Sequence, residues 1–236
     1  MKDNWQALCD DILNGISSGD CKSKKPRLLL HACCAPCSSY TLEYLLKYFD
    51  ITIYYYNPNI HPAEEYARRL EELKNFLPRF LVDKNAVTGT AAARAELQET
   101  DYNPQEFFDA VQAQRDNLEN ESERGERCRR CYQLRMEKAY EYARQNGFDW
   151  FTTTLSISPH KDAQKINEIG RALYENALQA QNAAAPIAPK FLYSDFKKKN
   201  GYKRSLELSK EYGLYRQDYC GCVYSKQNIE RARTQG

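Results

Sequence analysis

Seven of the nine cysteines in this chain fall into three tight groups, and this grouping limits what the chain can become more than any other feature. The groups are Cys33-Cys34-x-x-Cys37, Cys128-x-x-Cys131 and Cys220-x-Cys222, separated from one another by about 90 residues. Each lies beside a segment with a clear helix or strand pattern. Thiols placed in this way can converge in a folded chain, where they bind soft metal ions or perform redox chemistry.

Length and composition favour one sizeable domain. The chain has 236 residues, of which 42% are hydrophobic, and it contains no apolar run long enough to span a bilayer. Residues 1–8 include Asp3 and lack the apolar stretch of a signal peptide, so we expect a cytoplasmic protein that does not bind a membrane. In that reducing compartment, clustered cysteines indicate metal binding or catalysis rather than a disulfide framework.

Most of the chain alternates between strand and helix patterns. Residues 1–26 read as an amphipathic helix followed by a Gly/Ser/Lys linker, an appendage to a single α/β catalytic domain at 27–236. We expect strands at Arg27–Ala32, Ile51–Tyr56, Arg79–Val82, Trp150–Thr154 and Lys190–Tyr193. We expect helices at Ser38–Tyr48, Pro62–Phe76, Arg127–Asn146, Lys161–Asn182, Lys203–Tyr212 and Lys226–Arg233, and a partly helical stretch at Thr90–Asn120.

This alternation predicts an α/β fold with a mostly parallel sheet and helices on both faces, of the Rossmann-like or HUP-like kind. In such sheets ligands bind beyond the carboxyl ends of the strands, where the Cys33 group stands. That loop contains no glycine, so it does not resemble a phosphate-binding loop and an ATP site there is not expected.

Net charge is only +2, yet positive residues are concentrated in three runs, two of them beside cysteine groups. Such runs are either solvated surface or a binding site for an anionic substrate near the thiols. The third run contains Lys197, Lys198, Lys199, Lys203 and Arg204.

Cys128 and Cys131 stand in the first turn of a predicted helix, where they share the positive end of its dipole. Arg127, Arg129 and Arg130 add positive charge, so we expect both cysteines to favour the thiolate form.

Cys33 and Cys34 are adjacent, and in an extended loop their side chains would point apart. A zinc ion needs four ligands that converge on one atom, whereas a cubane cluster offers irons at separate corners. Together with Cys128 and Cys131 they supply the four thiolates of a [4Fe–4S] cluster, which we favour over zinc. Cys37 is left as a labile ligand, a ligand to a second metal, or a helix cap.

Cys220 and Cys222 are separated by one glycine, so they can close only a small, strained disulfide. Strained disulfides are easily reduced and are typical of catalytic or regulatory sites, although a pair of further metal ligands remains the alternative.

Two polar residues are further candidates for a catalytic role. His31 ends the strand before the first cysteine group, where it either orients a thiolate, donates a proton, or is a buried structural residue. Asp195 is either an acid or metal ligand, or an N-cap of the following helix.

At these residues the chain resembles the epoxyqueuosine reductases of the QueH type. The resemblance runs from about Arg27 to Tyr224 and rests on five motifs in order. They are His31-Ala32-Cys33-Cys34-Ala35-Pro36-Cys37, Glu126-Arg127-Cys128-Arg129-Arg130-Cys131-Tyr132, Thr152-Thr153-Thr154-Leu155 with Ser158-Pro159-His160-Lys161, Asp195-Phe196-Lys197-Lys198, and Tyr215-Arg216-Gln217-Asp218-Tyr219-Cys220-Gly221-Cys222.

The resemblance implies an oxidoreductase that needs no cobalamin and removes the epoxide oxygen of epoxyqueuosine at the tRNA wobble position, the last step of queuosine synthesis. It further implies a cluster held by Cys33, Cys34, Cys128 and Cys131, and a redox-active disulfide between Cys220 and Cys222. An additional iron is implied for some members, with Cys37 as candidate ligand. The partners would be an electron donor and tRNA, whose phosphates we then expect to contact the basic run Lys197, Lys198, Lys199, Lys203 and Arg204.

Two other classes compete with this interpretation. A zinc-structured tRNA- or protein-binding module without catalysis would use the same thiols, and it would be colourless. A thiol–disulfide oxidoreductase acting on proteins would leave Cys33 and Cys34 without a role, and its CxxC would be expected after the first strand of a small βαβ fold.

Overall fold

The computed structural model describes residues 4–18, 25–88, 93–180 and 186–234. Its strands are β1 (Arg27–His31), β2 (Asp50–Tyr55), β3 (Ala95–Glu99), β4 (Trp150–Thr153) and β5 (Lys190–Phe191). Its helices are α1 (Trp5–Ser18), α2 (Ala35–Leu45), α3 (Ala63–Thr88), α4 (Pro104–Val111), α5 (Glu126–Gln145), α6 (Ala163–Gln179), α7 (Gly201–Glu211) and α8 (Val223–Thr234), with a 3-10 turn η1 (Thr154–Ile157).

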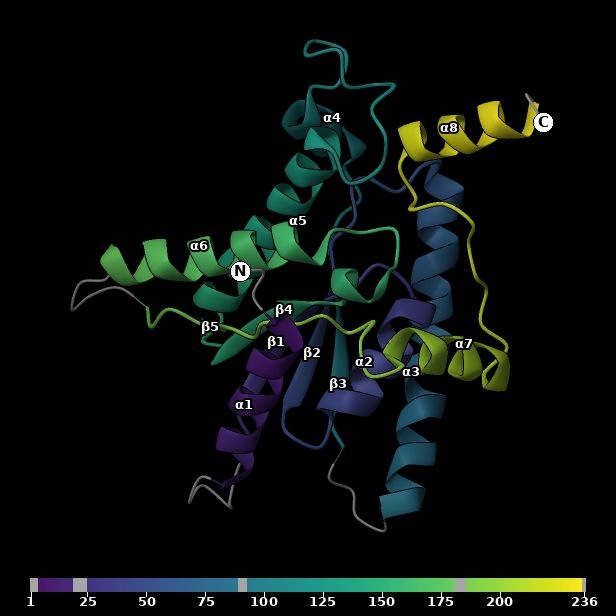
Figure 1. Cartoon of the computed structure of the whole chain (residues 1–236). Coiled ribbons are helices and arrows are strands. Elements are labelled where there is room, and N and C mark those ends of the chain that lie inside the picture. Colours follow the sequence, from purple (N-terminus) through teal and green to yellow (C-terminus); the bar gives the residue numbers. More distant parts are fainter. Residues whose placement is uncertain (1–3, 19–24, 89–92, 181–185, 235–236) are drawn as a thin grey trace.

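The strands form one parallel sheet in the order β3-β2-β1-β4-β5, which confirms the predicted fold class (Figure 1). Successive side chains of β1 point to opposite faces of the sheet and so belong to two separate core clusters. Leu28 and Leu30 face a cluster that includes side chains of α1, α2, α3 and α7, whereas Leu29 faces a cluster built on α5 and α6. Both faces of the sheet are therefore covered, as a buried parallel sheet requires.

The strand order places a switch point at β1. From β1 the chain builds outward to β2 and β3, then returns to the other side of β1 with β4 and β5. Connections diverge at the carboxyl ends of β1 and β4, which opens a crevice there. Cys33 and Cys34 follow β1 directly, and η1 follows β4.

The prediction of a strand at Arg79–Val82 is wrong, because these residues belong to α3, which continues past Pro78. A proline inside a helix costs about 3 kcal/mol. Burial of large aromatic side chains on both sides of it offsets that cost: Phe76 and Phe80 are buried, with ring centroids 5.2 and 5.8 Å from that of Tyr212.

The strand next to β2 is instead β3, inside the stretch predicted to be partly helical. At the edge of the sheet its residues are at most half-buried, with Glu96 and Glu99 exposed, so it lacks the apolar pattern of the central strands. The helical part of that stretch is α4, which begins at Pro104.

Helix α1 packs on the main body through a buried face. Cys9 and Leu13 belong to the same core cluster as Leu28. Trp5 donates a hydrogen bond of 2.8 Å to the side chain of Gln164, and its ring stacks on Tyr193 at 5.5 Å. Cys21, in the linker, lies outside the described residues. Within the described part of the chain, no helix is both long enough and apolar enough to cross a bilayer.

Candidate functional site

The first cysteine group is shaped by the start of α2. This helix begins at Ala35, three residues before the predicted start, and Cys34 is its N-cap in an extended conformation. The Cys34 sulfur accepts a hydrogen bond from the backbone N–H of Cys37 at 3.4 Å, which folds the helical turn back over it. As a result the sulfur atoms of Cys33, Cys34 and Cys37 all lie within 4.8 Å of one another.

This geometry corrects two expectations. The side chains of Cys33 and Cys34 do not point apart, because their sulfur atoms are 3.8 Å from each other. Because these thiols converge, their geometry is compatible with a single metal ion such as zinc as well as with a cluster. Cys37, which the sequence left over, is a member of the compact group.

The three thiols share hydrogen bonds that polarise the group. Bonds from Cys34 and Cys37 hold the pKa of Cys33 well below its ordinary value. The bond to Cys33 in turn raises the pKa of Cys34 to about 12, and it also raises the pKa of Cys37. A buried group with one thiolate and two further sulfur donors is suited to binding a soft metal.

Cys128 and Cys131 occupy the first turns of α5, as predicted, but their expected activation is wrong. Burial raises the pKa of both thiols, to about 11 for Cys128. The neighbouring arginines are engaged elsewhere: Arg127 donates to backbone carbonyls, whereas Arg129 and Arg130 form ion pairs with carboxylates. With these three arginines engaged elsewhere, desolvation is the largest influence on the pKa of both thiols and raises it.

The third group forms a tight turn before α8. The sulfur atoms of Cys220 and Cys222 are free thiols 3.5 Å apart. Gly221 adopts φ +109°, and its carbonyl oxygen accepts a hydrogen bond of 2.8 Å from the backbone N–H of His61. Arg69 donates to the carbonyl oxygen of Cys220 at 3.4 Å. The turn is thus fixed against the segment that follows β2.

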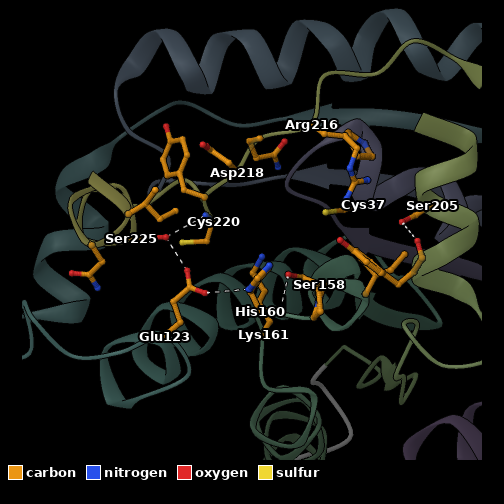
Figure 2. Close-up of a pocket in the computed structure, with 18 of the residues that line it drawn as sticks. Cys37, Glu123, Ser158, His160, Lys161, Ser205, Arg216, Asp218, Cys220 and Ser225 are labelled. Atoms are coloured by element: carbon orange, nitrogen blue, oxygen red, sulfur yellow. Dashed lines mark hydrogen bonds and ion pairs between the residues drawn. The ribbon is translucent and has the colours of Figure 1, made fainter. Parts of the chain in front are cut away.

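A cavity of about 490 Å³ brings these elements together. Cys37 lines it from the first turn of α2 and Cys220 from the turn before α8, and Lys161 also lines it (Figure 2). A smaller cavity beside it is lined by Cys128, Cys131, Cys220 and Cys222, so Cys220 belongs to the walls of both. All three cysteine groups therefore meet at this crevice.

Two buried cations, Lys161 and Arg135, lie beside the cysteine thiols of the crevice. Burial lowers the pKa of the Lys161 amine, but negative charge on the sulfur atoms of Cys33, Cys37 and Cys220 has a larger opposite effect. The net result is a raised pKa. The guanidinium of Arg135, only 2% exposed, lies near both Cys131 and Cys33, whose negative charge raises its pKa against the effect of burial. The site is built to hold negative charge on sulfur.

Comparison with known proteins supports the resemblance drawn from the motifs. A family model described as epoxyqueuosine reductase QueH matches residues 28–228. The chain belongs to this family. The epoxyqueuosine reductase QueH of Streptococcus pyogenes serotype M1 is 45% identical over 204 residues, covering 86% of this chain and 72% of the relative. That of Staphylococcus epidermidis is 42% identical over 230 residues, covering 96% and 89%. That of Thermotoga maritima is 31% identical over 198 residues, covering 84% and 89%.

Two polar residues singled out in this QueH-family sequence lie outside the lining of both cavities. His31 is fully buried, and its ring bonds to the hydroxyl of Thr153 at 2.8 Å and to the carbonyl oxygen of Tyr56 at 3.1 Å. Burial, assisted by Arg135, lowers the pKa of His31 to about 3, which favours its structural alternative. Asp195 forms an ion pair with Lys197.

Much of the basic run is neutralised within the chain. Lys197 contacts Asp195, Lys199 contacts Asp10, and Arg204 binds Glu43 through two nitrogens at 2.9 and 3.0 Å. Lys198 and Lys203 are exposed, and none of the described ion pairs involves them. These two lysines are therefore the members of the run with charge free for a phosphate.

Three residues of the site in this QueH-family chain were not among those predicted from the sequence: Lys161, Arg135 and Glu123. Lys161 stood within a recognised motif, and Arg135 lies one helical turn after Cys131, so helical spacing alone would have put it on the thiol face. Glu123 carries no such signal, because its position depends on how the loop before α5 packs against α8.

The pKa of Cys220 gives the first prediction. A hydrogen bond from Cys222, with help from Lys161, lowers it to about 6. We expect the rate of alkylation of Cys220 by iodoacetamide, followed by peptide mass spectrometry, to rise through about pH 6 and level off above pH 7, because the thiolate is the nucleophile. Cys9, whose pKa burial raises to about 12, should stay unmodified. A rate that climbs steadily to about pH 9, as for an ordinary thiol, would contradict this.

The second prediction concerns the turn itself. At Gly221 an added Cβ would be 3.0 Å from both Arg69 Nη1 and Ile60 Cγ1, and φ is positive. We expect Gly221→Ala to lower the free energy of unfolding in urea by about 1–3 kcal/mol. In the matched control Gly15→Ala, the new Cβ in α1 has no atom within 4 Å, and stability should rise by about 0.5–1 kcal/mol. Equal effects of the two substitutions would refute the strain argument.

Proposed function

We propose that this chain reduces the epoxide of epoxyqueuosine in tRNA to the alkene of queuosine; its relatives are named epoxyqueuosine reductases. The observation that carries the proposal is the position of Cys220, a thiol of low pKa on the cavity wall with Cys222 3.5 Å away, in a chain that matches the family along residues 28–228. The cavity provides the space, and the thiol pair provides the reductant.

The thiol pair balances the reaction. Conversion of the epoxide to an alkene breaks two C–O bonds, forms the second C–C bond and releases the oxygen as water, which requires two electrons and two protons. Oxidation of Cys220 and Cys222 to a disulfide, with an S–S bond of about 2.05 Å, releases both electrons and both protons. The electron donor then restores the dithiol by reducing the disulfide.

The donor set fits an iron–sulfur cluster. Cys33, Cys34, Cys128 and Cys131 are the proposed ligands, with Cys37 proposed for an additional iron, and the buried cations Lys161 and Arg135 offset the negative charge of such a group. When bound, a cluster supplies single electrons, and an iron with an open position supplies a Lewis acid for the departing oxygen. The protein orients the substrate and keeps the thiols away from bulk water.

Purification without oxygen tests the cofactor and the reaction together. We expect brown protein with broad visible absorbance, about four irons and as much sulfide per chain. It should convert epoxyqueuosine to queuosine in tRNA when a dithiol reductant is added. Colourless protein with stoichiometric zinc and no conversion would favour the zinc-structured binding module instead.

The unpaired wobble base suits the cavity. Bases in a loop are recognised by stacking on aromatic rings and by contacts to the backbone phosphates. Tyr202 and Tyr219 line the cavity, and Lys203 lies next to Tyr202 on α7. We therefore propose that the loop phosphates run over α7, with Lys198 and Lys203 as the principal contacts.

This placement gives a third prediction. Replacing Lys198 and Lys203 together by alanine should reduce the slope of log K against log salt for an anticodon stem-loop by about 1.4 to 1.8, because each lost phosphate contact removes about 0.7 to 0.9. Fluorescence anisotropy over a salt series measures it. Lys190→Ala is the control, since this exposed lysine begins β5 at the amino-terminal edge of the sheet, opposite the cavity. An unchanged slope in the double variant would move the RNA surface elsewhere.

A further inference from the structure

Glu123 stands where the two cavities meet. The large cavity and the thiol-lined cavity share four side chains, Glu123, His160, Lys161 and Cys220. Figure 2 shows Glu123 below Cys220, between Ser225 and His160. A ligand that lies in the large cavity and reaches toward Cys220 and the thiol-lined cavity therefore comes close to its carboxylate.

The carboxylate is fixed by one of its oxygen atoms. Ser225 donates a hydrogen bond of 2.8 Å to Oε1, and the backbone N–H of Ser225 donates to the sulfur of Cys222 at 3.3 Å. The other oxygen, Oε2, lies 3.9 Å from Nδ1 of His160, beyond hydrogen-bond distance. With a side-chain exposure of 31%, Glu123 keeps this oxygen available for a ligand.

A structural link to Ser225 does not need a negative charge, because the amide of a glutamine would accept the same hydrogen bond. The charge also acts against the thiols, since Glu123 raises the pKa of Cys220 in opposition to Cys222 and Lys161. A carboxylate at this position is favourable when a bound molecule brings a positive charge to it.

Epoxyqueuosine carries such a charge. A secondary amine joins the aminomethyl group of its 7-deazaguanine base to the epoxycyclopentane ring, and alkylamines are protonated at neutral pH. With the base in the large cavity and the epoxide at the thiols, the ammonium group lies between them. We propose that Glu123 binds this ammonium group and thereby selects a cationic base; the inference rests on the proposed function.

Binding of two RNA probes tests the role without any turnover. Both are the same anticodon stem-loop, one with 7-aminomethyl-7-deazaguanine at the wobble position, which is cationic, and one with 7-cyano-7-deazaguanine, which is neutral. Their phosphates are identical, so backbone contacts cancel. The full-length wild-type protein, purified without oxygen, should bind the cationic RNA about ten-fold more tightly, as expected for one charge-assisted contact.

Glu123→Gln should bind the two RNAs equally, within about two-fold, while keeping the hydrogen bond from Ser225. Asp218→Asn is the matched comparison: it removes the same charge from another wall of the large cavity, where Asp218 is paired with Arg233, and it should keep the preference. A preference that persists in Glu123→Gln, or that is absent from the wild type, would overturn the proposal.

Kinetics separate this inference from the one on which it rests. With the epoxyqueuosine stem-loop, Glu123→Gln should raise KM by about ten-fold and change kcat much less, because the contact with the ammonium group is made equally in the bound substrate and in the transition state. Wild-type protein that does not reduce this substrate would overturn the proposed function. If the wild-type protein reduces the substrate but Glu123→Gln still prefers the cationic RNA, only the proposed role of Glu123 is overturned.

Discussion

Cys222→Ser protein is expected to keep its visible absorbance and its affinity for tRNA but to lose multiple-turnover reduction of epoxyqueuosine by about 10⁴-fold or more. A serine hydroxyl cannot form the disulfide, so Cys220 alone cannot deliver two electrons. The lower pKa of Cys220 also depends first on the hydrogen bond from Cys222. Alkylation of Cys220 at neutral pH should therefore slow in the same variant.

The measurement compares conversion of epoxyqueuosine-containing tRNA by nucleoside mass spectrometry with iron content and absorbance on the same sample. Cys9→Ala provides the control, because Cys9 is a fully buried thiol in α1 that lines neither cavity. It should lose some stability and retain turnover. Loss of absorbance in Cys222→Ser would instead make Cys222 a metal ligand, and full turnover would remove the pair from the mechanism.

The central part of the fold could be predicted because its strands carry continuous apolar runs. Residues around Leu29 and Phe151 are buried on both faces of the sheet, and no other element gives that pattern over so few residues. The edge could not be predicted. Strand β3 (Ala95–Glu99) has only two apolar residues and two glutamates, and it pairs with β2 at the edge of the sheet, so its own sequence does not predict a strand.

The sequence allowed us to predict which segments of the chain carry the site, but not the positions or the protonation of the individual thiols. The order of strands is enough to place Cys33 at the carboxyl ends of the parallel strands. Cys220 follows no strand, and its turn is held at the crevice by contacts with His61 and Arg69. Whether Cys33 and Cys34 converge depends on where α2 begins, which the cap at Cys34 decides. Protonation of Cys128 depends on burial by other elements, which no local pattern encodes.

Ion pairs with residues distant in sequence also reduce the positive charge that a basic run can offer to RNA. Lys199 and Arg204 look like RNA contacts in the sequence, yet Asp10 and Glu43, each more than 150 residues away, neutralise them. Such partners come from helices α1 and α2 on the same side of the sheet as α7. A run of charges in sequence is therefore an upper bound on the charge presented to a ligand.

The membership of Cys37 in the compact thiol group leads to the last prediction. If Cys33, Cys34, Cys128 and Cys131 hold the cluster, Cys33→Ala should lose nearly all of its iron and sulfide, because a cluster that lacks one thiolate is released or degraded. Cys37→Ala should retain about four irons with their sulfide and lose no more than the additional iron. Both variants should lose activity, so activity alone does not separate them.

Iron and sulfide analysis of anaerobically purified Cys33→Ala, Cys37→Ala and Cys128→Ala protein makes the distinction. Cys9→Ala again serves as the control and should match the wild type. If Cys37→Ala is depleted of iron while Cys128→Ala is not, the ligands are the three sulfur atoms that lie within 4.8 Å of one another plus a fourth donor, and Cys128 has another role. Because Cys131 shares Arg135 with Cys33, that outcome would point to Cys131 as the fourth.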